Sequence, residues 1–545
     1  MPSKHISIRL LISSIYCLAS LGAYAADEKV DLALINKIRD EGMNRSQVMQ
    51  TLSTLTDEIG PRLTGSPGLR KAGEWTKAQL TEMGMQNAHT ESFAPFGKSW
   101  SIEKSSIRML TPAKAELIAI PRAWTGSTDG IKRAKVVYAK FENEEDLAKW
   151  KGKLNGVVLL RTPPAPTKPQ MKADASRYTE KELADIAAHD LIDPKNDEPA
   201  PNRPPFNAAA AAKAGEFSKK LLPYFIEEKV LATVFASYSH DGTVFVQEGG
   251  SFKNDAPPYT FASVVMAAEN YNRLYRLVNS KKEVELELDV QVNFSQEDPA
   301  NSINVFADFP GSDKKEEVVM LGGHLDSWHG GTGATDNGAG VAVAMEAMRI
   351  LKAVGFKPRR TIRIGLWGGE EQGLLGSKDF IKKYVAEFNE PKKDAKINEK
   401  QDEKDTPALK LKPLHNKISA YFNLDNGYGK IRGIYTENNL QVQPIFDAWL
   451  APFRDLGATT STMKNTDGTD HEAFEDVGVP GFQFIQDPMD YDSRTHHSNM
   501  DVFDKVQKGD MMQAAIIMAS FVAHAANRDE MLPRKPLPKE STRGN

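Results

Sequence analysis

EVVMLGGHLDS, residues 317–327, opens the part of the chain that decides the fold. Its short apolar run is typical of a buried β-strand. After a glycine-rich stretch, GAGVAVAMEAMRILKAVG at 338–355 places apolar residues at helical spacing, and RTIRIGLWGGEE at 360–371 contains a second apolar run. The order strand, helix, strand favours two parallel strands joined by a helical crossover.

The same alternation continues on both sides of this segment. Further strand-like runs lie at 283–294, 418–427 and 479–487, and further helical patterns lie at 375–388, 441–457 and 509–526. Strands that alternate with helices predict an α/β fold, with a mostly parallel central sheet flanked by helices. Residues 48–84 also have a helical pattern, interrupted by a Pro/Gly/Ser loop.

A block from about 105 to 282 has a less regular pattern. It contains the strand-like runs AKVVYAKF (134–141) and NGVVLLRT (155–162), and an Ala/Lys-rich helix candidate at 206–222. We interpret this block as a smaller inserted domain.

The N-terminus has the three parts of a secretory signal peptide. Lys4 and Arg9 precede an apolar stretch, and Ala23-Tyr24-Ala25 has the A-x-A pattern of a cleavage site. The apolar stretch is too short to span a bilayer. We therefore expect residues 1–25 to be removed and the mature chain to be exported, either to a bacterial periplasm or to the medium.

Composition excludes several classes of function. The 545 residues carry a net charge of −4 and are 40% hydrophobic and 26% charged, which does not favour binding to nucleic acid or to a membrane surface. The one cysteine, Cys17, lies in the predicted signal peptide, which excludes disulfides, a thiolate nucleophile and a cysteine-ligated metal from the mature chain. A serine hydrolase is also disfavoured, because no G-x-S-x-G motif follows a strand.

Polar side chains collect where the predicted strands end, or in the loop that enters the helix at 338–355. They are His324, Asp326, Asp336, Glu370, Glu371 and Asp425. Open α/β sheets bind their ligands at the carboxyl ends of the strands, so we expect these side chains to converge. Carboxylates that converge without a basic partner either have raised pKa values or bind a divalent cation.

The residue types indicate which metal and which chemistry. Imidazole and carboxylate ligands without thiolates suit Zn²⁺, Mn²⁺ or Co²⁺ better than Ca²⁺. A carboxylate at Asp336, in this glycine-rich stretch, can bridge two ions. The adjacent pair Glu370 and Glu371 allows one to bind metal while the other takes a proton from water. A phosphate-binding role for the glycine-rich loop is a weaker interpretation, because the loop has neither a G-x-G-x-x-G motif nor a P-loop lysine.

Several motifs together resemble those of the co-catalytic di-zinc exopeptidases, a family that includes bacterial leucyl aminopeptidases and carboxypeptidase Q. They are GHLDS (323–327), TDNGAG (335–340), GGEEQGLLGS (368–377), NLDNG (423–427) and HHSNMD (496–501), with 55–75, 468–482 and 531–535 as further matching segments. Residues 151–160 and 258–278 are similar to the protease-associated domain inserted in many members.

The resemblance implies a zinc exopeptidase (phosphorylase/hydrolase-like) fold with a β-rich protease-associated insert. Residues 26–104 are the expected first part of the peptidase domain, 105–282 the insert and 283–530 the main part with the metal site. A flexible tail is expected at 531–545.

The resemblance also implies a role for each candidate residue. Asp336 bridges two zinc ions; His324 and Asp425 complete one site, Glu371 and His497 the other; Glu370 is the general base, Asp326 orients His324, and His471 contacts substrate. His497 is preferred to His496 because His497-Ser498-Asn499-Met500-Asp501 has the family spacing. His329, in a glycine-rich turn expected to be exposed, is given no role.

The implied function is an exported zinc exopeptidase that acts on peptides or dipeptides. Whether it is an aminopeptidase or a carboxypeptidase Q-like dipeptidase is left open. A glutaminyl cyclase with one zinc and an inactive binding protein are weaker alternatives, because every expected ligand is present. The oligomeric state is also left open, a homodimer being one option.

Overall fold

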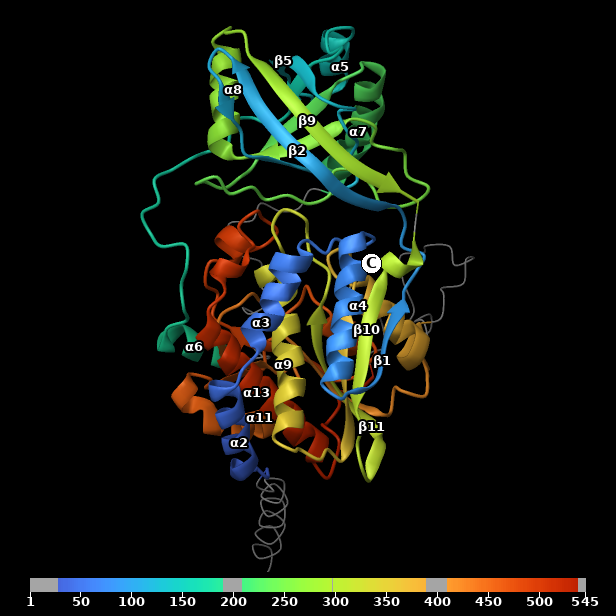
Figure 1. Ribbon diagram of the computed structural model, residues 1–545, viewed down its shortest axis with the longest axis vertical. Coiled ribbons are helices and arrows are strands. Elements are labelled where there is room, and N and C mark those ends of the chain that lie inside the picture. The colour runs from blue at the N-terminus through green and yellow to red at the C-terminus, as the bar shows by residue number, and fades with distance from the viewer. Residues whose placement is uncertain (1–27, 190–207, 297, 389–408, 538–545) are drawn as a thin grey trace, which may run out of the picture.

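The computed structural model describes residues 28–189, 208–296, 298–388 and 409–537. The predicted signal peptide lies outside these residues. Figure 1 shows two parts, each built on its own sheet, with the second sheet above the first. The larger part contains most of the helices.

The main sheet has eight strands. Across the sheet they are β1 (Gln86–Ser92), β10 (Ile303–Phe309), β12 (Arg360–Trp367), β11 (Lys314–His324), β15 (Ile418–Asn423), β18 (Gly481–Gln486), β16 (Ile431–Tyr435) and β17 (Thr460–Thr462). The central strands β12, β11, β15 and β18 are parallel, while β1 and β10 pair antiparallel with their neighbours. Strand β16 is antiparallel to β18 and parallel to β17. The predicted α/β fold with a mostly parallel sheet is confirmed.

Helices cover both faces of the main sheet. They are α2 (Leu32–Asn44), α3 (Val48–Ser53), α4 (Pro67–Glu82), α9 (Ala339–Ala353), α10 (Leu375–Phe380), α11 (Gln443–Leu450), α12 (His471–Glu475) and α13 (Lys508–Asn527). Short π or 3₁₀ turns lie at Thr54–Ile59, Pro299–Asn301, Ala334–Gly338, Ile381–Val385, Ala451–Leu456, Tyr491–Thr495 and Phe503–Lys505, and β13 (Ala386–Phe388) pairs with β14 (Leu409–Leu411).

Alternate residues of β11 show how the two faces are filled. Val319 and Leu321 belong to the large core shared with α2, α3, α4, α9, α11 and α13, whereas Val318 and Met320 belong to the core shared with α10 and α12. Successive side chains of a strand point to opposite faces, so an apolar run without alternation fits a sheet that is covered on both sides. The sheet is therefore the middle layer of three.

The second sheet also has eight strands. In order they are β3 (Ala115–Glu116), β2 (Ser99–Thr111), β9 (Glu285–Ser295), β5 (Lys132–Tyr138), β6 (Val158–Leu160), β7 (Ala232–Ala236), β8 (Ala262–Met266) and β4 (Ala119–Pro121). The helices α5 (Glu144–Trp150), α7 (Ala208–Glu227) and α8 (Ala268–Asn279) lie beside it (Figure 1). The strand predicted at 283–294 pairs with β2 and β5, so it belongs to this sheet rather than to the main one.

Two further segments pack against the main part. Helix α6 (Glu180–Ala187) lies against the larger part in Figure 1, where Thr462 donates a hydrogen bond to Ile186 O. Leu532 is buried and Arg534 donates to His415 O over 2.7 Å, so residues 531–535 pack against the main part, where the sequence predicted a flexible tail. None of the helices in the described residues has the length and hydrophobicity needed to cross a membrane.

Candidate metal centre

The predicted ligands come from four segments that meet at the carboxyl ends of the parallel strands. His324 is the last residue of β11, Glu370 and Glu371 follow β12 after two glycines, and Asp425 lies two residues beyond β15. The fourth segment follows β18 and carries His496 and His497, and Asp336 lies in the turn that precedes α9.

Close backbone packing brings Asp336 and Asp425 to the same place. The side chain of Asn337 donates to Leu424 O over 3.0 Å and accepts from Gly340 N over 2.9 Å. A Cβ atom on Gly340 would lie 2.2 Å from Leu424 O. Only glycine therefore allows the first turn of α9 to approach the loop that carries Asp425.

One group of side chains surrounds the imidazole of His324. Its Nε2 atom lies 3.1 Å from Asp336 Oδ1, 3.3 Å from Asp425 Oδ1 and 4.0 Å from Glu370 Oε2. His324 is 1% exposed. One buried imidazole nitrogen thus faces three carboxylates.

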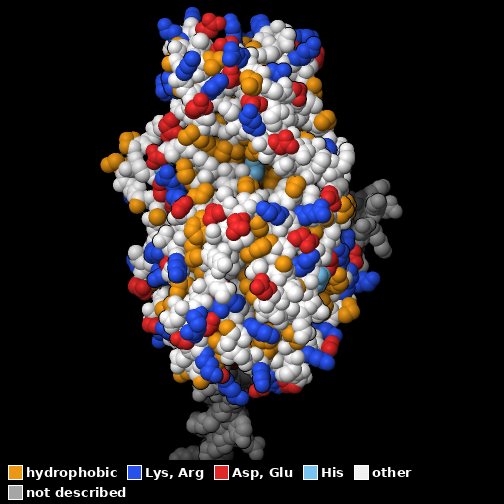
Figure 2. Space-filling view, viewed as in Figure 1, with side chains coloured by type: hydrophobic (Ala, Val, Ile, Leu, Met, Phe, Trp, Pro, Cys, Tyr) orange, Lys and Arg blue, Asp and Glu red, His pale blue; other side chains and the backbone are white. Residues whose placement is uncertain are grey.

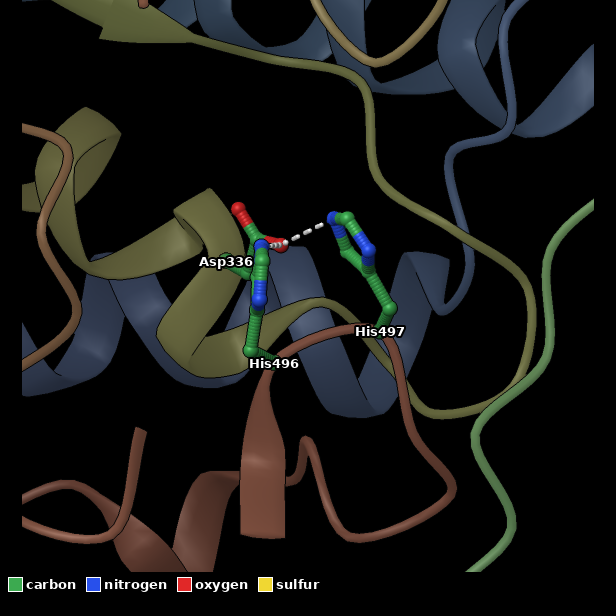
Figure 3. A group of neighbouring side chains, drawn as sticks. All are labelled: Asp336, His496 and His497. Atoms are coloured by element: carbon green, nitrogen blue, oxygen red, sulfur yellow. Dashed lines mark ion pairs between the residues drawn. The ribbon is translucent and has the colours of Figure 1, made fainter. Parts of the chain in front are cut away.

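A second group surrounds the other oxygen of Asp336. Asp336 Oδ2 lies 3.3 Å from His497 Nε2, which is itself 2.9 Å from Glu371 Oε2. His496 Nε2 is farther from Asp336 Oδ2, at 3.7 Å, and its side chain is more exposed, 39% against 21% for His497. Figure 3 shows both histidines beside Asp336, with a dashed line to each imidazole.

The carboxylate of Asp336 therefore belongs to both groups, with one oxygen in each. Its Oδ2 atom, Asp425 Oδ1 and Glu371 Oε1 are buried and accept no hydrogen bond. Buried carboxylate oxygens normally have a hydrogen-bond partner, and an ion is a common explanation where they have none. Ligand atoms of His324, Asp336 and Glu371 lie within 4.8 Å of one another, as do those of His324, Glu370 and Asp425. The nitrogen and oxygen donors fit zinc.

The cluster has unusual proton affinities without an ion. Burial lowers the pKa of His324, but Asp425 and Glu370 outweigh it and hold the pKa well above its usual value. Burial likewise opposes protonation of His497, yet Glu371 and Asp336 raise its pKa to about 11. Burial, with Asp336 nearby, raises the pKa of Glu371 to about 7. Without an ion, bound protons thus offset the negative charge of the clustered carboxylates, and a divalent cation can replace these protons.

Comparison with known proteins shows similarity to peptidases. Residues 304–522 match the model of peptidase family M28. Mouse carboxypeptidase Q is 26% identical over 512 residues, which are 93% of this chain and 91% of the mouse protein. Leupeptin-inactivating enzyme 1 of Streptomyces exfoliatus is 31% identical over 183 residues, 33% of this chain and 35% of that protein.

Solved structures show the same fold. An M28 peptidase precursor from Shewanella amazonensis SB2B has a TM-score of 0.61 at 23% identity, covering 93% of this chain and 98% of its own. The zinc aminopeptidase of Bacillus subtilis has a TM-score of 0.50 at 16% identity, covering 89% and 95%. In sequence and in fold, the chain therefore resembles zinc exopeptidases of peptidase family M28.

In the candidate metal centre, Asp326 connects the two glutamates with His324. Its side chain is fully buried and lies 3.5 Å from His324 Nδ1, which is also 3.1 Å from the backbone oxygen of Asp326. The same carboxylate accepts hydrogen bonds from the backbone N–H groups of Glu370 and Glu371 over 3.3 and 3.4 Å, and from Thr64 Oγ1 over 2.8 Å. Contacts of this kind fix the orientation of a metal-binding imidazole.

Two charged residues that support the centre were not predicted. Arg62 is fully buried and donates to the backbone oxygens of Leu325 and Gly333 over 2.7 and 2.8 Å. Asp501 accepts from the side chain of Thr335 over 2.8 Å, one residue before Asp336. Both occur in motifs of the peptidase family, which was the one signal in the sequence that could have indicated them.

Two other histidines, His329 and His471, are buried among contacts that the sequence did not reveal. His329 was expected in an exposed turn, but it is 8% exposed, and its Nε2 lies 2.7 Å from Pro121 O in the second part. His471 is fully buried, with Nε2 3.2 Å from Thr466 O and 3.5 Å from Glu437 Oε1. Substrate contact by His471 stays a prediction.

Proposed function

We propose that the chain is a zinc exopeptidase that holds two zinc ions and cleaves dipeptides. His324, Asp336 and Asp425 would hold one zinc, and Asp336, Glu371 and His497 the other. The observation that carries the proposal is the division of Asp336, whose Oδ1 faces His324 while Oδ2 faces His497. Zinc ions at such a pair of sites supply Lewis acids that polarise a carbonyl and activate water.

The residues of the chain have separate tasks in this proposal. Glu370 takes a proton from the attacking water and passes it to the leaving amine. In the metal-free protein, burial raises the pKa of Glu370 well above its usual value, although His324 opposes part of the effect. Asp326 keeps His324 in place and anchors the backbone of Glu370.

Dipeptidase activity of the carboxypeptidase Q type is supported by the extent of the similarity. The match to mouse carboxypeptidase Q covers 91% of that protein, whereas the match to leupeptin-inactivating enzyme 1 covers 35%. Aminopeptidase activity is the second candidate, supported by the fold shared with the Bacillus subtilis zinc aminopeptidase. The signal-like N-terminus supports export of the enzyme.

The test uses the zinc-loaded enzyme and three kinds of dipeptide: free, N-acetylated and C-amidated. A dipeptidase cleaves only the free form, an aminopeptidase also cleaves the amidated form, and a carboxypeptidase also cleaves the acetylated form. Zinc analysis should give two ions per chain. A folded, zinc-loaded protein that cleaves none of the three would overturn the proposed function.

A further inference from the structure

A pocket of about 420 Å³ lies beside the metal centre, between the two parts of the molecule. Its wall is formed by Trp124, Glu248, Gly250, Ser251 and Phe252 from the second part, and by Glu371 and Gln372 from the loop after β12. Because Glu371 is a proposed ligand, the pocket adjoins the centre. Figure 2 shows hydrophobic side chains gathered in the hollow between the two parts.

The second part supplies an aromatic wall that continues to the metal centre. The rings of Trp124 and Phe252 lie 5.4 Å apart, and Trp328 lies 6.2 Å from Trp124. Trp328 is in turn 6.1 Å from the imidazole of His497. Trp124 and Trp328 are 1% and 4% exposed, and Phe252 is partly exposed. A substrate side chain that leaves the centre on this side would therefore lie against the rim of this aromatic cluster, which suits long apolar groups and cations.

Two buried polar groups beside the pocket have no partner in the described protein. They are the side-chain amide of Gln372, of which both the nitrogen and the oxygen are unpaired, and the indole Nε1 of Trp328. An unpaired buried amide is costly, so its presence next to a proposed metal ligand indicates a ligand that pairs with it. The amide can turn toward the pocket by rotation about the side-chain bonds of Gln372.

The charge of the pocket indicates which side chains it accepts. Glu248 is exposed at its wall, and none of the described residues that line it is a lysine or an arginine. Arg122 donates a hydrogen bond to the backbone oxygen of Glu248 over 2.7 Å, but Arg122 does not line the pocket, whose charged lining residues are Glu248 and Glu371. The pocket therefore attracts a basic side chain and repels an acidic one.

We propose that this pocket binds the substrate side chain on the Glu371 side of the centre. Gln372 hydrogen-bonds the peptide backbone there, Trp124 and Phe252 contact the side chain, and Glu248 selects basic or apolar residues against acidic ones. This inference rests on the proposed function, and it assigns specificity to the second part of the molecule.

The first test compares dipeptides that contain lysine, norleucine or glutamate, each placed at the first and at the second position with serine as partner. At one position the wild type should prefer lysine and norleucine to glutamate. Glu248→Lys should lower the lysine-to-glutamate ratio of kcat/KM about tenfold or more, since attraction and repulsion exchange for both substrates. Asp255→Lys is the matched control, because Asp255 is an exposed acid of the second part that does not line the pocket.

The second test is Gln372→Leu, which keeps the size of the side chain but removes the amide. We expect kcat/KM to fall about 3- to 30-fold, while the melting temperature stays the same or rises because an unpaired buried amide is gone. Gln247→Leu, at an exposed position beside Glu248, should change neither.

The outcomes separate this inference from the proposed function. A wild type that cleaves no dipeptide contradicts the proposed function itself. An active wild type with the same substrate ratio in Glu248→Lys and Asp255→Lys overturns the selection by Glu248. If Gln372→Leu loses activity and stability together, Gln372 is a structural residue and its contact with substrate is wrong.

Discussion

The two sheets of the molecule are similar in plan and different in chemistry. Each has eight strands, with four neighbouring parallel strands: β12, β11, β15 and β18 in the main sheet, and β5, β6, β7 and β8 in the second. At the carboxyl ends of the first set lie His324, Asp425 and the two glutamates that follow β12.

At the carboxyl ends of the parallel strands in the second sheet lie side chains that form hydrogen bonds with the backbone. Tyr271 donates to Thr162 O over 2.5 Å and accepts from Thr162 N over 3.0 Å, just after β6. Parallel topology thus provides a place where side chains can converge, but the side chains determine whether that place is a site. Substitutions at the two sets of strand ends test this difference.

The largest effect is expected at Asp336, because it is the one residue shared by both groups. Asp336→Ala should reduce bound zinc below one ion per chain, whereas Asp425→Ala should leave about one. Activity of Asp336→Ala should fall by about 10³-fold or more, as expected when metal catalysis is lost. Elemental analysis and dipeptide hydrolysis measure both, and equal zinc loss in the two variants would contradict a shared carboxylate.

Glu370→Gln should retain zinc but lose the general base. We expect kcat to fall about 10²- to 10⁴-fold, which is the usual contribution of such a group. A zinc-loaded Glu370→Gln variant with near-normal kcat would show that another group moves the proton.

Asp326→Asn should have a smaller effect, because Asp326 acts through other residues. Its carboxylate holds the backbone of Glu370 and Glu371 and faces His324. Loss of such a contact commonly reduces metal affinity or activity about 10- to 100-fold. Zinc affinity measured by competition with a chelator, together with kcat, checks this, and an unchanged affinity and rate would contradict a positioning role.

Asp501→Asn tests the pH dependence of the metal-free protein. Burial, together with Asp336, raises the pKa of Asp501 to about 7, above its value in the unfolded chain. The folded state therefore binds more protons than the unfolded state between about pH 4 and 7, and stability falls as pH rises through this range. The variant should melt higher than wild type at pH 8, and the gap should close toward pH 4. Thermal melts across this pH range measure the difference in melting temperature. A difference that widens toward pH 4 would contradict a raised pKa of Asp501.

Tyr271→Phe is the matched change on the second sheet. It removes both hydrogen bonds to Thr162 and should cost about 1–3 kcal/mol of stability. Zinc content and kcat should stay at wild-type values, because these strand ends carry no proposed ligand. Zinc loss in Tyr271→Phe would contradict this prediction and would show that the second sheet influences zinc binding.

Much of the main part could be predicted because its signals are local. Apolar runs without alternation indicated a sheet covered on both faces, and β11 fills a core on each side. The second sheet was harder to outline, since β2 and β9 pair across about 180 positions of sequence and hydropathy does not reveal such a partner. For the same reason His329 was expected to be exposed, whereas it contacts Pro121, 208 positions away.

The sequence by itself determined the fold class, the absence of any cysteine after Cys17, and the residue types at the ends of the strands. These follow from periodicity and from side-chain chemistry, which short segments carry alone. Only the tertiary structure decided that the two oxygens of Asp336 face different histidines, that Arg62 is buried beneath the loop after β11, and that Trp124 and Gln372 share a pocket. These features depend on atoms that distant segments bring within a few ångströms, and no local pattern specifies such contacts.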